Sequence, residues 1–169
     1  MQDEAAGRLR PLAVDDLETI RAWRNHPNVR SSMFSTSEIS REEHQGWFDR
    51  ASADAARRLL LLERDDRAIG FVQFQILGGG GIAEWGFYVA PGAKKGTGGL
   101  LARHALRFAF RDAGFHKVCG RVLAFNEPSI AFHLKFGFQR EGILREHHFD
   151  GSRYHDVLCF GLLKPAQQD

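Results

Sequence analysis

A glycine-rich stretch near the middle of the chain constrains the fold more than any other feature. It reads Ala90-Pro-Gly-Ala-Lys-Lys-Gly-Thr-Gly-Gly99. The preceding segment, 82–89, is typical of a strand, and the following segment, 100–113, is typical of a helix that ends at Gly114. The first N–H groups of a helix have no acceptor within the helix, and glycine lets a ligand approach them closely. This order of strand, glycine loop and helix predicts a phosphate site.

The residues around the loop narrow the kind of phosphate ligand. Lys94 and Lys95 add two positive charges, so a phosphate or pyrophosphate is the natural ligand. The loop lacks the GxxxxGK[ST] order of a P-loop. It also lacks the dinucleotide-binding fingerprint, because Leu101 stands where the third glycine would be needed. From the loop alone, a plain flexible turn remains the alternative.

The hydrophobic pattern predicts one mixed α/β domain over the 169 residues, with its core at about 8–164. Ser40 and Glu43 form a capping box before one of the helices, and Asp150-Gly151 is typical of a tight hairpin. A polar loop is expected at 25–37. Strands are expected at 8–12, 57–63, 68–77, 82–89, 117–123, 138–149 and 152–163, and helices after Asp15, after Ser40, at 100–113 and after Asn126.

Composition excludes several classes of protein. The 23 basic and 21 acidic residues give a net charge of +2, which excludes a strongly basic nucleic-acid binder by bulk charge and leaves only a local basic patch open. No apolar run approaches the roughly 18–20 residues of a membrane span, and the polar start of the chain does not resemble a secretory signal. Cys119 and Cys159 lack metal-ligand spacing and are expected to be buried, reduced thiols. We expect a cytoplasmic protein without a metal, a nucleic-acid partner or a membrane partner.

Two motifs together resemble the GNAT superfamily of N-acyltransferases. The segment Ala93-Lys-Lys-Gly-Thr-Gly98 is similar to the family's Gln/Arg-x-x-Gly-x-Gly/Ala signature, although Ala93 departs at its first position. The segment Asn126-Glu-Pro-Ser129, which continues to Gly137-Phe138, is similar to the second signature. The resemblance covers residues 8–164. It implies a mostly antiparallel sheet, flanked by helices and splayed between strands 82–89 and 117–123, with acetyl-CoA bound in the gap.

The resemblance also implies which residues bind acetyl-CoA. Backbone N–H groups of Phe87, Tyr88 and Val89 are expected to face the thioester, turned toward it by a β-bulge. The other residues implied to bind the cofactor are Lys94, Lys95, Gly96, Thr97, Gly98, Gly99, Asn126, Ser129, Phe132 and Lys135.

Two residues are candidates for proton transfer. His133 stands where the family usually has a tyrosine that acts as general acid, and a histidine could protonate the departing thiolate. The alternative is a helix residue without that role. Glu84 lies in a strand and could accept a proton from the amine, or it could pair with an arginine. The sequence leaves both questions open.

The N-terminal third, 23–48, resembles GNAT enzymes that acetylate the 4-amino group of a UDP-linked amino-deoxy sugar in pseudaminic-acid biosynthesis, a pathway for flagellin glycans. On that reading Arg24, His26 and Arg30 could meet the nucleotide phosphates, and Trp47 could stack on the base or belong to the core. Asn25 and His26 could instead form a local turn. The substrate-binding residues expected are Arg24, Asn25, His26, Arg30, His44 and Trp47.

Two other functions are alternatives to acetylation of a UDP-linked amino sugar. One is a peptide N-terminal acetyltransferase of the ribosomal-protein type, which shares the cofactor motifs and a similar first helix. The other is a non-catalytic module that binds acyl-CoA, which would need the glycine loop but could dispense with Glu84 and His133. Whether the chain forms a homodimer is left open by the sequence.

Overall fold

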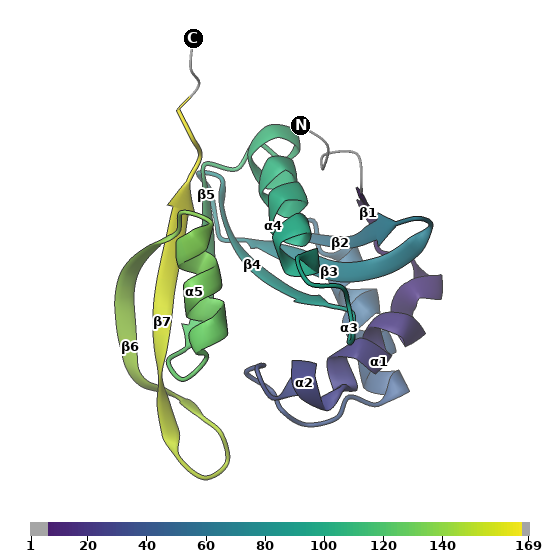
Figure 1. Cartoon of the computed structure of the whole chain (residues 1–169), viewed down its shortest axis with the longest axis horizontal. Helices are drawn as coiled ribbons and strands as arrows, with labels where there is room; N and C mark the ends of the chain where they lie inside the picture. The colour runs from purple at the N-terminus through teal and green to yellow at the C-terminus, as the bar shows by residue number, and fades with distance from the viewer. Residues whose placement is uncertain (1–6, 167–169) are drawn as a thin grey trace.

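The computed structural model describes residues 7–166 and is built on one seven-stranded sheet (Figure 1). The strands lie in the order β1-β2-β3-β4-β5-β7-β6. Neighbouring strands are antiparallel except for β4 and β5, which are parallel. This confirms the predicted mixed α/β fold with a mostly antiparallel sheet. The strands are β1 Arg8–Pro11, β2 Arg57–Arg64, β3 Arg67–Ile76, β4 Ile82–Val89, β5 Lys117–Leu123, β6 Gln139–Phe149 and β7 Tyr154–Leu163.

Helices cover both faces of the sheet, and alternation along β2 shows how. Leu60 and Leu62 pack into a core under α4, whereas Leu59 and Leu61 pack on the other face against α1 and α3. The run of four leucines is therefore a strand buried on both sides. The helices are α1 Leu17–Asn25, α2 Pro27–Arg30, α3 Arg41–Ala53, α4 Thr97–Arg107 and α5 Glu127–Lys135, with short turns η1 Val14–Asp16 and η2 Phe108–Asp112.

The pairing between β4 and β5 is short. Ile82, Ala83 and Glu84 pair with residues 117–119, and there the ladder ends although β4 continues to Val89 and β5 to Leu123. The two strands therefore separate beyond Glu84, as the family resemblance implies. In Figure 1 this separation divides the molecule into a part with β5, β6, β7 and α5 and a part with the remaining strands and helices.

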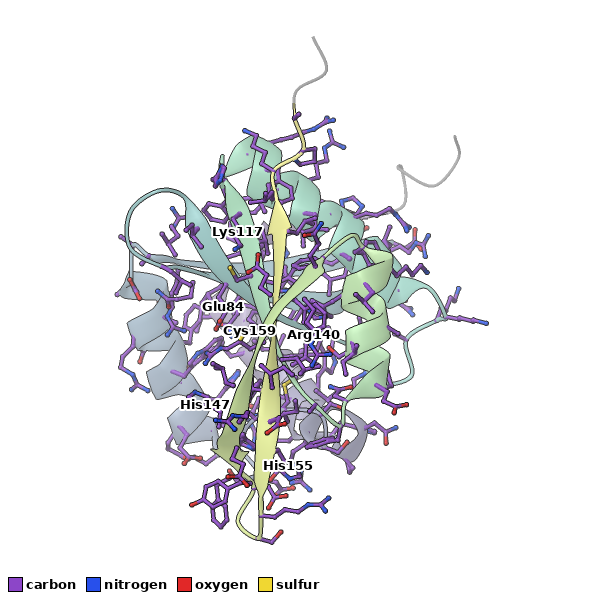
Figure 2. All side chains as sticks on the ribbon, turned by 90° about the vertical axis from the view of Figure 1, so that its left-hand side faces the viewer. Glu84, Lys117, Arg140, His147, His155 and Cys159 are labelled. Atoms are coloured by element: carbon purple, nitrogen blue, oxygen red, sulfur yellow. The ribbon has the colours of Figure 1, made fainter. Side chains whose placement is uncertain are left out.

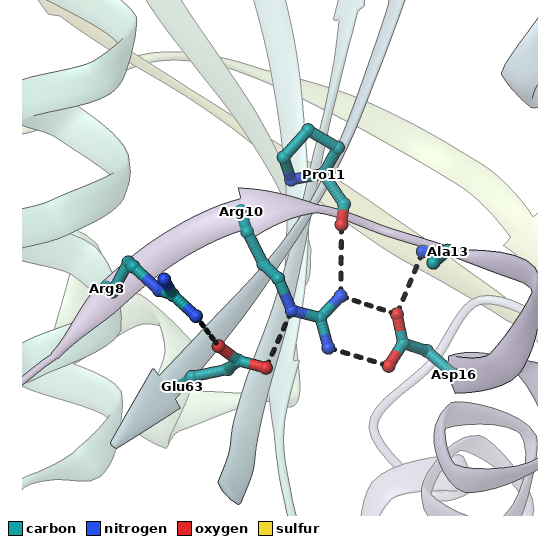
Figure 3. Close-up of polar contacts among 6 residues, drawn as sticks. All are labelled: Arg8, Arg10, Pro11, Ala13, Asp16 and Glu63. Carbon is teal, nitrogen blue, oxygen red and sulfur yellow. Dashed lines mark hydrogen bonds and ion pairs between the residues drawn. The ribbon is translucent and has the colours of Figure 1, made fainter. Parts of the chain in front are cut away.

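Ion pairs attach the short first strand to its neighbours (Figure 3). The guanidinium of Arg10 donates to Glu63 on β2 at 2.6 Å and to both carboxylate oxygens of Asp16 at 2.6 and 2.8 Å. Arg8 donates to the other oxygen of Glu63 at 2.8 Å. These hydrogen bonds lower the pKa of Asp16 and of Glu63 below their usual values. Both carboxylates thus stay ionised and hold β1 in register.

Local structure departs from the sequence prediction in two places. The expected polar loop at 25–37 contains the one-turn helix α2, which begins at Pro27 and is capped by the ring of His26. The helix after the glycine loop begins at Thr97 rather than at residue 100. It ends in the wider turn η2, where the N–H of Ala113 donates to the carbonyl of Phe108 at 2.8 Å.

Gly120 on β5 gives a testable prediction about packing where β4 and β5 separate. A Cβ at this position would lie 2.6 Å from Nε2 of His133 and 3.0 Å from Nε1 of Trp85. We expect Gly120→Ala to lower the free energy of unfolding by about 1–3 kcal/mol, the usual cost of overpacking. Urea unfolding measures this. The matched control is Gly79→Ala, where a Cβ meets nothing within 4 Å. Equal stability of the two variants would contradict the packing described.

Candidate active site

A cleft of about 900 Å³ opens where β4 and β5 separate. It is lined from both faces of the sheet. Trp85 and Phe87 face it with α5 and the start of α4 on one side, and Glu84 and Tyr88 face it with α1 and the loop after α2 on the other. Because successive side chains of a strand point to opposite faces, β4 contributes to both sides. We call them the α5 side and the α1 side.

The start of α4 offers bare backbone at the α5 side. Gly96 caps the helix with a φ of 94°, in the left-handed region that favours glycine, and a Cβ there would meet nothing within 4 Å. Thr97 is buried and its hydroxyl donates to the carbonyl of Lys94 at 2.7 Å, so this side chain shapes the loop. Gly98 lines the cleft, and Gly99 follows it in the first turn. Their N–H groups have no acceptor within the helix.

The bare first turn fits a pyrophosphate, as acetyl-CoA requires, because amide N–H groups and the helix dipole both favour an anion there. Lys94 and Lys95 are exposed beside the loop. Their side chains can add positive charge near such an anion.

The backbone of β4 is the second part of the α5 side. Beyond Glu84 the strand keeps its ladder with β3, from Gly86 opposite Gln73 to Val89 opposite Gly70, while its β5 edge has no ladder. N–H groups alternate between the two edges of a strand, so those of Phe87 and Val89 can donate into the cleft. The N–H of Tyr88 differs from the expectation, because it lies on the β3 side of the strand, as does that of Ala90, which donates to the carbonyl of Ile69 at 3.0 Å. The expected bulge is absent, because the β3–β4 register runs without a shift through these described residues. The departure of β5, not a bulge, frees the amides.

The second motif places three of its expected residues at the cleft. The side chain of Asn126 caps α5 by accepting from the N–H of Ser129 at 3.2 Å, and both residues line the cleft. The ring of Phe132 lies 5.1 Å from that of Phe87 across the opening. Lys135 is exposed near the end of α5, outside the cleft lining, and its contact with the cofactor stays a prediction.

The geometry of His133 does not support the expected role of general acid. The side chain is buried, with 2% of its surface exposed. An indole N–H can only donate, so Nε2 of His133 accepts from Nε1 of Trp85 at 3.1 Å. Nδ1 then carries the proton and donates to the carbonyl of Ser129 at 2.8 Å. Burial lowers the pKa of His133 below its usual value. The ring is therefore neutral, and both of its nitrogens are engaged.

Glu84 forms a two-point ion pair with Arg121 on β5. Both guanidinium contacts measure 2.8 Å, and they raise the pKa of Arg121 above its usual value. The sequence leaves open whether Glu84 accepts a proton from the amine or pairs with an arginine, and the structure shows the pairing with an arginine. Arg121, 37 residues away along the chain, was not singled out from the sequence, because only the parallel pairing of β4 and β5 brings it there.

Arg24 is the expected substrate residue that does line the cleft. One nitrogen of its guanidinium donates to the carbonyl of Ser35 at 2.6 Å. A second nitrogen of the guanidinium, Nη1, is buried without a hydrogen-bond partner in the described residues. Burial lowers the pKa of Arg24 below its usual value. A buried guanidinium N–H without an acceptor is costly, so this atom is placed to receive a ligand's oxygen.

Further side chains line the α1 side of the cleft that are not predicted from the sequence to do so. Burial raises the pKa of Tyr88, whose phenol lies in the field of Arg24. Gln73 and Gln75 of β3 and Arg57 of β2 also line the cleft. The alternation of β3 could have indicated that the two glutamines share one face, since residues two apart in a strand do so.

The other five expected substrate residues lie outside the cleft lining. Asn25 exchanges two hydrogen bonds with the backbone of Ile39, and the ring of His26 caps α2. Arg30 pairs with Glu38 at 3.4 Å. His44 is buried and stacks on Trp47 at 5.1 Å, and Trp47 packs on the core. These side chains hold the α1–α3 region together, and their expected role in substrate binding stays a prediction.

Comparison with known proteins identifies the family. A family model described as the acetyltransferase (GNAT) domain matches residues 8–139. The chain belongs to the GNAT acetyltransferase family. A solved structure of spermidine N-acetyltransferase from Vibrio cholerae, in complex with CoA and spermine, superposes with a TM-score of 0.87 at 27% identity. The match covers 95% of this chain and 97% of that one. GNAT acetyltransferases use acetyl-CoA, and the bare turn at α4 fits this cofactor.

Two relatives are similar in sequence. The SPbeta prophage-derived uncharacterized N-acetyltransferase YokL of Bacillus subtilis is 34% identical over 111 residues, which are 63% of this chain and 62% of YokL. The match therefore spans less than two thirds of YokL. Acetyltransferase PseH of Campylobacter jejuni is 26% identical over 127 residues, 75% of this chain and 79% of PseH. Family and neighbours together support N-acetyltransferase activity with acetyl-CoA.

The histidine near the hairpin, the two cysteines and the helices bear on the expectations about metals, thiols and membranes. His155, near the β6–β7 hairpin, pairs with Asp150 at 2.6 Å, and residues 7–166 contain no group of three or more His, Cys, Asp or Glu that could hold a metal ion. Cys119 and Cys159 are free thiols and are partly rather than fully buried. Among the described residues, no helix has both the length and the apolar character needed to cross a membrane.

The neutral state of His133 predicts how stability depends on pH. Its pKa is lower in the folded protein than in the unfolded chain, so its contribution is complete above about pH 6.5 and is lost as the pH falls below that value. Between pH 7.5 and 5.5 one such histidine accounts for up to about 1.4 kcal/mol. We expect His133→Gln to reduce the loss of stability on acidification, measured by urea unfolding at both pH values.

His116, which is exposed, provides the matched control. His116→Gln should lose as much stability on acidification as the unchanged protein. His44 is also buried with a lowered pKa, so part of the pH dependence should persist in His133→Gln. An unchanged pH dependence in His133→Gln would contradict the neutral, buried state of this ring.

Proposed function

We propose that the protein transfers the acetyl group of acetyl-CoA to the 4-amino group of a UDP-linked amino-deoxy sugar. Such a reaction would belong to pseudaminic-acid biosynthesis and supply a flagellin glycan. The observation that carries the proposal is the charge of the α1 side, where the acceptor would bind. Three arginines and one carboxylate line the cleft, and the carboxylate, Glu84, is committed to Arg121.

The uncompensated charge lies at Arg24. Arg57 has Asp54 at 3.4 Å, and Arg121 has Glu84, but no carboxylate of the described chain forms a salt bridge with Arg24. A nucleoside diphosphate carries oxygens that can accept from the unpartnered Nη1. The amide side chains of Gln73 and Gln75 are available for the hydroxyl and carbonyl groups of a sugar or base. The resemblance to PseH points to the same acceptor class.

The chemistry needs a neutral amine and donors for the charge that develops on the thioester oxygen. Acetyl-CoA supplies an activated acetyl group. The free N–H groups of β4 are placed to donate to the carbonyl oxygen, and the start of α4 can hold the pyrophosphate. The amine would approach from the α1 side, so that it meets acetyl-CoA in the opening between β4 and β5. With the ring of His133 neutral and engaged, the departing thiolate would take its proton from solvent or from the amine.

A polyamine is the acceptor that the Vibrio cholerae neighbour suggests, and the same observation argues against it here. Spermidine is a polycation at neutral pH and would need carboxylates around it. The described lining of the α1 side offers one carboxylate, already paired, and three guanidinium groups. Charge repulsion would therefore oppose polyamine binding.

An acceptor panel tests the proposed function. The protein is incubated with acetyl-CoA and, separately, UDP-4-amino-4,6-dideoxy-N-acetyl-β-L-altrosamine, spermidine and a short peptide with a free N-terminus. Mass spectrometry then detects the acetylated products. We expect acetylation of the nucleotide sugar and little or none of the others. Preferred acetylation of the peptide would favour the ribosomal-protein type of enzyme, and preferred acetylation of spermidine would contradict the charge argument.

Replacing Arg24 should weaken acceptor binding. Arg24→Gln removes the unpartnered cation, and a hydrogen bond to a charged group is worth about 1.5–3 kcal/mol. We expect KM for the nucleotide sugar to rise by roughly 10- to 100-fold, with a smaller effect on kcat, because the contact is present before and during the reaction. Steady-state kinetics measures both values. Arg30→Gln is the matched control and should behave like the unchanged protein, since Arg30 lies outside the cleft lining.

A further inference from the structure

Two side-chain links join the two parts of the molecule where β4 and β5 separate. They start from neighbouring residues of β4, Glu84 and Trp85, which point to opposite faces of the sheet. We propose that these links set the width of the opening and thereby position the free β4 amides for the thioester. The proposal rests on the acetyl-transfer part of the proposed function and is independent of which acceptor is used.

The link on the α1 side is the ion pair of Glu84 with Arg121. Glu84 is the last β4 residue paired with β5, and Arg121 lies two residues beyond the last paired residue of β5. The two-point contact fixes both the distance and the direction of the side chains. Arg121 and Glu84 keep 47% and 26% of their side-chain surface exposed, so the pair adds little to overall stability. Figure 2 labels Glu84 beside the point where β6 and β7 cross in that view.

The link on the α5 side is the hydrogen bond from Trp85 to His133. Both side chains are buried, and their rings are fixed by stacking, Trp85 on Phe138 at 5.1 Å and His133 on Phe160 at 5.2 Å. Gly120 of β5 lies directly beneath the pair and leaves no space for a side chain of its own. The link therefore joins β4 to α5 through a rigid aromatic group rather than through a flexible chain.

The position of the links explains why they would matter for the reaction. Beyond Glu84 no backbone ladder joins β4 to β5 within the described sheet, so only side chains hold the two edges at a fixed separation. Donors stabilise a developing charge only within about 2.7–3.1 Å of the oxygen. One link on each face resists both widening and twisting of the opening. Glu84 and His133 are thus positioning residues rather than the base and the acid that the sequence leaves open as possibilities.

Exchanging the charges of the ion pair tests the proposal with acetyl-CoA alone. Glu84→Arg and Arg121→Glu each place like charges across the opening, whereas the double variant restores an ion pair. We expect each single variant to bind acetyl-CoA about five- to tenfold more weakly by calorimetry, as for the loss of one or two hydrogen bonds. The double variant should return to within about twofold of the unchanged protein. The single variants change net charge in opposite directions, so a shared loss is not a long-range charge effect.

Two further variants complete the design. Trp85→Phe keeps an aromatic ring but removes the N–H donor, and it should weaken acetyl-CoA binding about fivefold. The matched control is Glu141→Lys, which breaks the 2.8 Å ion pair with Lys117 between β5 and β6, away from the opening. This control should bind acetyl-CoA like the unchanged protein. Circular dichroism at the temperature of the calorimetry verifies that each variant is folded.

The outcomes separate the proposal from its alternatives. Unchanged acetyl-CoA affinity in folded Glu84→Arg, Arg121→Glu and Trp85→Phe would overturn it and leave the links as ordinary packing contacts. A double variant as weak as the single variants would also overturn it, because Glu84 would then act through its own charge. If the acceptor panel fails while this test succeeds, the acceptor assignment is at fault and the positioning role stands.

Discussion

The end of the β4–β5 ladder at Glu84 and Cys119 is the constraint on which the rest of the structure depends. Parallel strands that separate cannot satisfy their facing backbone groups with each other, so the β4 edge beyond Glu84 is left with free donors. The same separation creates a cleft open to both faces of the sheet. A donor that binds through the start of α4 and an acceptor that binds near α1 can therefore meet at one strand.

The two sides of the cleft differ in chemistry because they are built from alternate residues of the same strand. On the α5 side, Trp85 and Phe87 join Phe132 and the neutral ring of His133, which gives an apolar wall beside free amides. On the α1 side, guanidinium groups and amides predominate. An apolar wall excludes water from the thioester, and a cationic wall selects acceptors with negative charge.

The parts of the site that depend on local sequence could be predicted. The glycine loop and the cap at Asn126 follow from short segments with specific backbone requirements, and the separation of the strands around them is implied by the family resemblance. Partners far apart in the chain could not be predicted: Trp85 meets His133 across 48 residues, and Glu84 meets Arg121 across 37. For Asn25 and His26 the sequence leaves open a substrate contact or a local cap, because polar residues after a helix suit both, and in the structure both side chains make local hydrogen bonds. The positive charge of Arg24 makes it a candidate phosphate contact from the sequence, but only the folded structure shows that its Nη1 has no hydrogen-bond partner among the described residues.

The most direct measurement is a crystal structure of the protein with acetyl-CoA. We predict the pyrophosphate at the N–H groups of Gly96, Gly98 and Gly99, because that of Thr97 donates to the carbonyl of Lys94. We also predict the thioester oxygen within hydrogen-bond distance of a β4 amide beyond Glu84, with the ion pair of Glu84 and Arg121 and the hydrogen bond of Trp85 and His133 intact. A complex with the pyrophosphate away from α4, or with the thioester outside the opening between β4 and β5, would contradict these predictions.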